Sequence, residues 1–418
     1  MKFNKLTSAL MVFAVVGVAA LPVSSAFAAP DAAKIAERKA RKSQAVGEKI
    51  GKAIGKAFEL YNANQITEAI ALLEPITPTS DFDKAFRAKF LGSLYAEKNP
   101  AKAARYLEEA IKYDVLSFTD QASAIRTLAD LSIMDKQYEK AVKHYNAWLD
   151  FTGELNPDVE MRIANCYYEL KQFAKVIAPS DRAIAHYKEP KKGPYDMKFG
   201  AYYELKQNKK AIEVLEEIVT IFPNDKQSWV YLGNFYAMDE QYDRALAVIN
   251  MAYKQGYLTK ESEIKLLAQL YSNNNVPYKA AVLLEKHMKA GLVKKDRSNM
   301  LSIASSFNAA RNFKQAADYF GQVAQAENDG DLYRRQGNAL LLANETDKAV
   351  AALLKALDHG VKDKGKVHAD LLVAYFDQGK LKEANRHAQL ARDNGQAKFA
   401  NGWSAIIRQR AEKKGISL

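Results

Sequence analysis

The sequence predicts an all-α fold, an α-solenoid in which helical hairpins stack on one another. Two observations predict it. A small residue returns every 33 to 38 positions, and each return lies between two stretches with helical spacing of apolar residues. A fixed period in this range is typical of repeats that bury their apolar faces on their neighbours. The recurring residues are Ala69, Ala103, Ala141, Val176, Ala211, Ala245, Ala280, Ala316, Ala349 and Ala384.

The clearest copy of the repeat lies between residues 229 and 252. Its first helix places residues at i, i+3, i+4 and i+7 on one face: Trp229, Leu232, Gly233 and Tyr236. Its second helix, after a short turn at residues 239–241, repeats the arrangement with Ala245, Ile249 and Ala252. We expect Gly233 and Ala245 to let the two backbones approach closely, while Ile249 fills the space around that contact.

This order of large and small positions resembles the tetratricopeptide repeat (TPR), a pair of antiparallel helices. The other copies agree to varying degrees, and together they span residues 47–395. The resemblance implies about ten helix pairs that form a right-handed superhelix. After Gly395, residues 396–418 predict a C-terminal capping helix and a basic tail, because a terminal repeat otherwise exposes its apolar side. The apolar side of this helix comprises Phe399, Trp403, Ile406 and Ile407.

The first 28 residues read as a secretory signal peptide. Lys2 and Lys5 precede an apolar run, and a small-x-small motif ends at Ala28, so we expect cleavage between Ala28 and Ala29. The alternative is a retained membrane anchor, for which the apolar run is shorter than the ~20 residues that a spanning helix prefers. We therefore expect a periplasmic protein, exported and soluble after cleavage.

Residues 29–46 form a basic N-terminal arm that precedes the repeats. One interpretation is an amphipathic segment that contacts an anionic membrane or a partner. The other is a solvated N-terminal cap, followed by a first helix that packs tightly on the next unit through Gly47, Gly51 and Gly55. The whole chain carries a formal charge of +12, and removing Lys2 and Lys5 leaves +10. Because export makes nucleic acid an improbable partner, this charge favours an acidic protein or an anionic membrane surface.

The motifs that carry chemistry are missing from the sequence. The six histidines lack metal-ligand spacing, and no HExxH, GxSxG or GxxxxGK[ST] motif occurs. Cys166 is the single cysteine, and its place on a helical apolar face favours a small buried hydrophobe over a reactive thiol. We expect no enzyme, no cofactor and no metal site.

The resemblance to the TPR family also implies a binding surface, because the first helix of each pair lines the concave face in that family. In several of those helices a polar residue directly follows the small position, and these residues form a polar column with one member per repeat. The column comprises Asn165, Asn234, Gln269, Ser305 and Asn338. Carboxamides donate and accept hydrogen bonds at once, so the column suits an extended peptide, although a concave face must also be polar for solubility alone. Tyr168 and Phe376, further along two of these helices, are either aromatic anchors for a bound chain or packing residues.

Two members of the column have a cation four residues earlier. Lys265 precedes Gln269 and Arg334 precedes Asn338, which resembles half of the carboxylate clamp of some TPR proteins. Ala201 and Leu301 depart from that clamp at the intervening groove positions, so its specificity is not carried over.

These observations lead to one functional hypothesis and one alternative. The first is an exported protein–protein interaction adaptor, whose overall organisation resembles the periplasmic TPR proteins that accompany TonB-type energy-transduction systems. The alternative is an assembly or structural factor for outer-membrane proteins, polysaccharide export or pili. The oligomeric state and the partner do not follow from the sequence.

Overall fold

A computed structural model describes residues 31–418, so the predicted signal peptide and its cleavage site lie outside the described residues. The chain divides into two compact units, one ending at Tyr187 and the other beginning at Lys188. The sequence predicted one continuous solenoid over residues 47–395, and the division falls inside it. A short connection that contains Pro190 and several charged residues separates the last helix of unit 1 from the first helix of unit 2.

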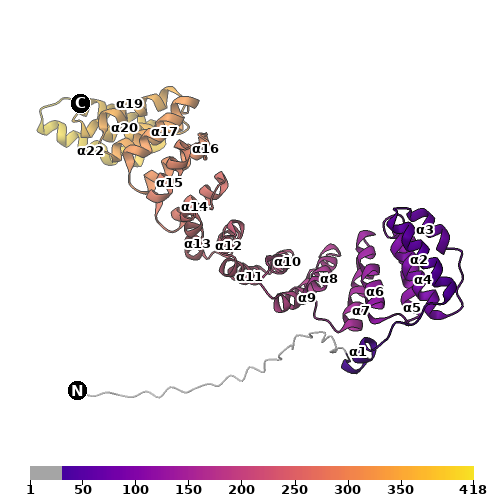
Figure 1. The fold of residues 1–418 in the computed structure, drawn as a ribbon. Coiled ribbons are helices and arrows are strands. Elements are labelled where there is room, and N and C mark those ends of the chain that lie inside the picture. The colour runs from indigo at the N-terminus through magenta and orange to yellow at the C-terminus, as the bar shows by residue number, and fades with distance from the viewer. Residues whose placement is uncertain (1–30) are drawn as a thin grey trace, which may run out of the picture. The chain divides into compact units, whose positions relative to one another are not determined.

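Helices make up nearly the whole described chain (Figure 1). Unit 1 contains α1 (Ala32–Lys39), α2 (Glu48–Asn62), α3 (Ile66–Leu73), α4 (Asp81–Tyr95), α5 (Pro100–Lys112), α6 (Phe118–Met134), α7 (Tyr138–Thr152), α8 (Pro157–Glu169) and α9 (Phe173–His186). Unit 2 begins with α10 (Lys192–Glu204), α11 (Asn208–Ile221), α12 (Lys226–Met238), α13 (Tyr242–Lys254), α14 (Glu261–Asn273), α15 (Pro277–Lys289) and α16 (Arg297–Ala309). It ends with α17 (Phe313–Glu327), α18 (Gly330–Leu342), α19 (Thr346–Asp358), α20 (Lys364–Asp377), α21 (Leu381–Ala391), the π-helical turn η1 (Arg392–Gln396) and α22 (Ala397–Lys413).

The helices from α2 to α21 form ten consecutive pairs, as the repeat predicted. Every recurring small residue lies on the second helix of its pair, and all ten are completely buried (0% exposed). The period in the sequence therefore marks the points of closest packing between helices, which confirms the α-solenoid prediction. No helix among residues 31–418 combines the length and the apolar character needed to cross a bilayer.

The turn between the two helices of a pair has a common geometry. In nine pairs the residue five positions before the recurring small residue has a positive φ, and eight of these nine residues are not glycine. The residue directly after this positive-φ residue donates its backbone N–H to a carbonyl near the helix end over 2.8–2.9 Å, which closes a Schellman-type cap. The exception is the α4–α5 pair, whose turn is one residue short and begins α5 with Asn99 and Pro100.

Glycine at the small position of a first helix permits the close approach that the sequence predicted. A Cβ atom at Gly233 would lie 2.2 Å from Cγ1 of Ile249 on the partner helix. At Gly337 it would lie 2.6 Å from Cγ of Leu353, and at Gly92 it would lie 2.7 Å from Cγ of Leu107. Three pairs thus share one packing device, in which a branched side chain of the second helix fills the space above a glycine.

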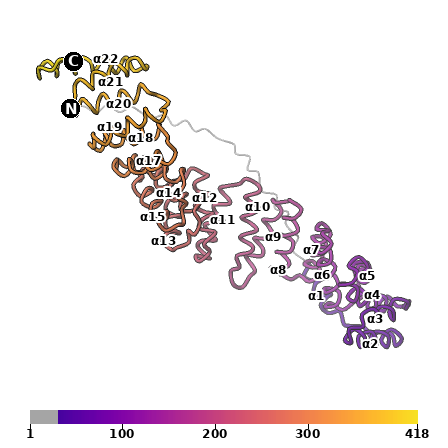
Figure 2. The backbone as a smooth tube through the Cα atoms, turned by 90° about the horizontal axis from the view of Figure 1, so that it is seen from above, coloured from indigo at the N-terminus to yellow at the C-terminus, as the bar shows by residue number. Residues whose placement is uncertain are grey.

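The C-terminal helix α22 packs on α21 and α20 (Figure 2). Its Ile407 is completely buried among residues of both helices, and its Trp403 meets the ring of Phe376 edge-on at 5.1 Å. Phe376 is therefore a packing residue under the capping helix. The predicted apolar side is only partly used, since Phe399 and Ile406 remain 41% and 47% exposed. Of the predicted residues only Ile407 is fully buried, and Ala400 and Ala411 face inward beside it.

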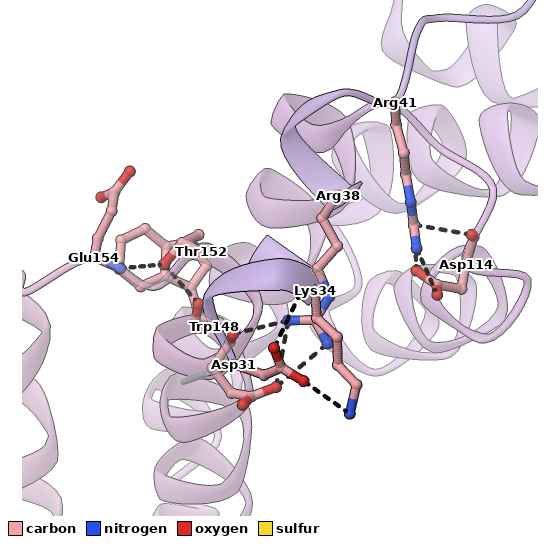
Figure 3. Close-up of polar contacts among 9 residues, drawn as sticks. Asp31, Lys34, Arg38, Arg41, Asp114, Trp148, Thr152 and Glu154 are labelled. Atoms are coloured by element: carbon pink, nitrogen blue, oxygen red, sulfur yellow. Dashed lines mark hydrogen bonds and ion pairs between the residues drawn. The ribbon is translucent and has the colours of Figure 1, made fainter. Parts of the chain in front are cut away.

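The N-terminal arm does not cap the first helix pair. Helix α1 lies against α7, two pairs further along the chain. Arg38 of α1 and Arg41, which follows the helix, bind carboxylates of unit 1 (Figure 3). The glycine series predicted to pack tightly is also open, because nothing lies within 4 Å of a Cβ at Gly51 or Gly55. Helix α2 instead buries Ile50 and Ala57, on a different line of the helix.

Candidate binding hollows on unit 2

Two adjoining hollows on unit 2 bring together four of the predicted groove residues. A hollow of about 360 Å³ is lined by Lys265, Gln269 and Ser305. A wider one of about 810 Å³ is lined by Lys265, Gln269 and Asn234. Lys265 and Gln269 thus border both hollows, and the first helices α12, α14 and α16 supply all four side chains. The one-per-repeat spacing in the sequence is what places them side by side.

The four side chains differ in how free they are to bind. Asn234 is half-buried and donates its Nδ2 hydrogen to the carbonyl of Val230 over 2.8 Å, one turn earlier in α12. Lys265, Gln269 and Ser305 are exposed. The strongest donors and acceptors for an extended backbone are therefore on α14 and α16.

Two further lysines border the wider hollow, and the groove argument had missed them. Lys260 precedes α14 and Lys294 precedes α16, so they belong to loops rather than to the helical face that was searched. Within residues 31–418 no carboxylate forms an ion pair with either of them or with Lys265. Glu261 and Asp296 also line the hollow, but Glu261 accepts from Asn299, and Asp296 caps α16. Three lysines against two carboxylates leave the hollow with one net positive charge.

Asn299 is a buried polar residue on the floor of the smaller hollow. It is 1% exposed, and its Nδ2 donates to Oε1 of Glu261 at 2.7 Å and to the carbonyl of Lys294 at 2.9 Å. Its Oδ1 is buried without a hydrogen-bond partner. The residue ties the start of α16 to the start of α14. It stands five positions before Ala304, off the predicted column, so the period did not reveal it.

Arg334 and Asn338 form a different arrangement, tied to an acidic residue of the next pair. Nε of Arg334 donates to Oδ2 of Asp370 in α20 over 3.2 Å, and Asn338 also hydrogen-bonds that carboxylate. Burial raises the pKa of Asp370, while Arg334 and Asn338 act in the opposite direction. The predicted cation–amide pair is thus engaged within the protein. An acidic residue 36 positions after Arg334 was a signal in the sequence that could have indicated this.

The two predicted groove residues of unit 1 lie on α8. Asn165 and Tyr168 are both half-buried, and the Tyr168 ring meets Phe173 edge-on at 5.3 Å within the same helix pair. Cys166, between them, is completely buried, and burial raises the pKa of its thiol to about 11. This confirms the prediction of a small buried hydrophobe. Among the described residues no group of three His, Cys, Asp or Glu side chains is placed to hold a metal ion.

Comparison with known sequences identifies the repeat in part of the chain. Residues 197–256, from α10 to the end of α13, match the tetratricopeptide repeat family. No curated protein sequence matches the chain. The fold defines the class of the protein as an α-solenoid built of helix pairs. Within that class, residues 197–256 are similar to tetratricopeptide repeats.

Solved structures with a similar arrangement of helices are distant in sequence. Naa15/Naa10 bound to HypK-THB is 13% identical with a TM-score of 0.49, over 87% of this chain and 66% of that one, slightly under two thirds of its length. The C-terminal part of a TPR repeat-containing protein from Cytophaga hutchinsonii is 15% identical with a TM-score of 0.36, over 64% and 94%. YrrB, described as a TPR protein with an unusual peptide-binding site, is 18% identical with a TM-score of 0.35, over 47% and 96%.

Proposed function

We propose that this protein is an adaptor that holds an extended segment of a partner protein across α12, α14 and α16 of unit 2. The observation that carries the proposal is the pair of adjoining hollows that share Lys265 and Gln269. A peptide backbone exposes both donors and acceptors, and carboxamide and hydroxyl side chains at successive helices match them. No catalytic role is proposed.

We further propose that the bound segment is acidic. Lys260, Lys265 and Lys294 surround the wider hollow, and the two carboxylates beside them are engaged in capping and in bonding Asn299. An acidic side chain entering there would gain charge-assisted hydrogen bonds, and its affinity would fall as salt concentration rises.

A pair of double variants tests the role of the hollows. Lys265→Ala with Gln269→Ala is expected to weaken binding of a captured partner at least tenfold, which corresponds to about 1.4 kcal/mol. The matched control is Lys289→Ala with Gln322→Ala, which removes the same two residue types from exposed positions on the second helices α15 and α17. Equal affinity of the two double variants would mean that the polar column is only a solvated surface.

The cellular setting is proposed from the sequence alone. The signal-peptide pattern of residues 1–28 supports export to a bacterial periplasm, where the adaptor would serve an envelope machine. A TonB-type energy-transduction complex is the first partner to test, and assembly factors for outer-membrane proteins, polysaccharide export or pili are the alternative. Affinity capture from envelope extract, with the Lys265→Ala, Gln269→Ala variant in parallel, separates these. The alternative is favoured if the unsubstituted protein captures pilus or polysaccharide components rather than TonB-type ones, and if the variant fails to capture them.

A further inference from the structure

The N-terminal arm lies along one edge of unit 1 and makes a contact with each of three separate carboxylates. Arg38 binds Asp150 at the end of α7, and Arg41 binds Asp114 in the connection between α5 and α6. Directly after the arm, the N–H of Gly47 donates to Oδ1 of Asp83 in α4 over 2.9 Å. The arm therefore runs opposite to the order of the helix pairs, from α7 back to α4 (Figure 3 shows the contact of Arg41 with Asp114).

The Asp114 contact has the geometry of a specific recognition site. Nη1 and Nη2 of Arg41 donate to the two oxygens of the Asp114 carboxylate over 2.6 and 3.0 Å, and Nη1 also donates to the Asp114 carbonyl over 2.9 Å. This bidentate fork is available to arginine and not to lysine. The hydrogen bond to Asp114 is the main reason that the pKa of Arg41 is raised.

The Asp150 contact uses the end of a helix as well as a side chain. Nη1 of Arg38 donates to the backbone carbonyl of Asp150 over 2.8 Å and approaches its Oδ2 at 3.4 Å. Carbonyls in the last turn of a helix have no partner within the helix, and the helix dipole favours a cation there. Gly153, with φ of +65°, leaves room for Ile35 of the arm, since a Cβ at this glycine would lie 2.3 Å from Cδ1 of Ile35.

Two stacked aromatic rings lie beneath the cations of the arm. Phe118 and Phe151 stack with centroids 5.4 Å apart. The guanidinium of Arg38 lies 5.0 Å from the centre of the Phe151 ring, and the ammonium of Lys39 lies 5.9 Å from that of Phe118. Carboxylates beside aromatic faces suit a segment that carries arginine, because both attract a guanidinium. We refer to Asp83, Asp114, Asp150, Phe118 and Phe151 as the acidic edge.

These contacts hold the arm at the surface rather than in a core. Helix α1 has no buried residue, and the side chains of Asp114 and Asp150 remain 55% and 67% exposed. Ion pairs with partners this exposed are individually weak and are screened by salt. The arm thus resembles a tethered ligand in equilibrium with a released state more than a structural element of the solenoid.

We propose that the acidic edge is a binding site for a basic segment with an apolar residue and two arginines spaced three apart, and that the arm is its resident ligand. Ile35, Arg38 and Arg41 have this spacing, which places them on one side of the segment. While the arm is bound, its two arginines are unavailable to an anionic surface. Release frees the arginines and the acidic edge together.

A distance measurement in the full chain tests whether the arm occupies this edge. Spin labels are placed at exposed positions of the arm and the α7–α8 connection by Lys34→Cys and Glu154→Cys. Buried Cys166, with its raised pKa, reacts slowly. A single short distance is expected at low salt. The distribution of distances between the labels should broaden when Asp114→Asn and Asp150→Asn are added. It should stay narrow in the control Glu97→Gln with Glu139→Gln, which changes two exposed acids away from the arm.

Binding in trans tests whether the edge recognises the sequence. A peptide of residues 31–46 is titrated into the full chain carrying Arg38→Ala and Arg41→Ala, with circular dichroism confirming that the fold is retained. We expect saturable binding at least ten times tighter than to the unsubstituted chain, whose own arm competes. The proposal fails if the two chains bind the peptide equally, or if the short distance persists in the Asp114→Asn, Asp150→Asn background.

Discussion

Replacing Gly233 by alanine tests whether the small positions of the repeat are needed for close packing. The added Cβ would lie 2.2 Å from Cγ1 and 2.3 Å from Cδ1 of Ile249, whereas carbon atoms in contact normally lie ~3.5–4.0 Å apart. The Ile249 side chain would have to move by more than ~1 Å. It is completely buried and β-branched, so it has few other rotamers available.

The free-energy change has two opposing parts. Alanine is about 1 kcal/mol more favourable than glycine in a helix interior, while overpacking a close-packed core costs about 1–3 kcal/mol. Gly402→Ala in α22 is the matched control, because nothing lies within 4 Å of its added Cβ and only the favourable part applies. Gly233→Ala is therefore expected to be less stable than Gly402→Ala by about 1–3 kcal/mol.

Hydrogen exchange of the amides of α12 and α13 is the suitable assay, because a solenoid can open locally without unfolding as a whole. Ile249→Ala removes both clashing atoms, so combining it with Gly233→Ala should cost less than the sum of the single changes. If Gly233→Ala increases the protection of α12 and α13 as much as Gly402→Ala increases that of α22, the close-approach argument is refuted.

Three other predictions concern turns, histidines and the cysteine. Lys206→Gly should stabilise the chain by up to about 1 kcal/mol in urea unfolding, because Lys206 has φ of +55° at a hairpin turn, whereas Gly379→Ala, at φ of +74°, should destabilise it. His387 and His368 are buried with their Nδ1 atoms 3.1 Å apart, and burial lowers the pKa of both, that of His387 to about 4. The unfolded chain takes up these protons at a higher pH than the folded chain, so the free energy of unfolding should fall as pH drops from about 6.5 towards 4. The fall is up to about 1.4 kcal/mol per pH unit per proton, and His387→Gln should reduce this slope of unfolding free energy against pH. Cys166 should react with a thiol reagent only as fast as its helix opens, so a rate equal to that of a free thiol in the native protein would contradict its burial.

The repeat architecture could be predicted from the sequence because the same contacts recur within each helix pair and between successive pairs. The ten recurring small residues had to be buried for the pairs to close, and all ten are. The turns followed from the same register, including the shortened one before Pro100. The groove was predicted in part: Gln269 and Lys265 border the hollows, but Arg334 and Asn338 are tied to Asp370.

The period alone determined the fold class, the number of helix pairs and the buried positions, since these depend on contacts between residues close in the chain. Contacts between residues far apart were decided only in the tertiary structure. Asp114 and Asp150 receive the arm from 73 and 112 residues away, and Phe376 lies under Trp403 rather than facing a partner. A repeat pattern reflects the contacts that each unit makes with the next. It does not indicate where a terminal segment outside the repeat will bind.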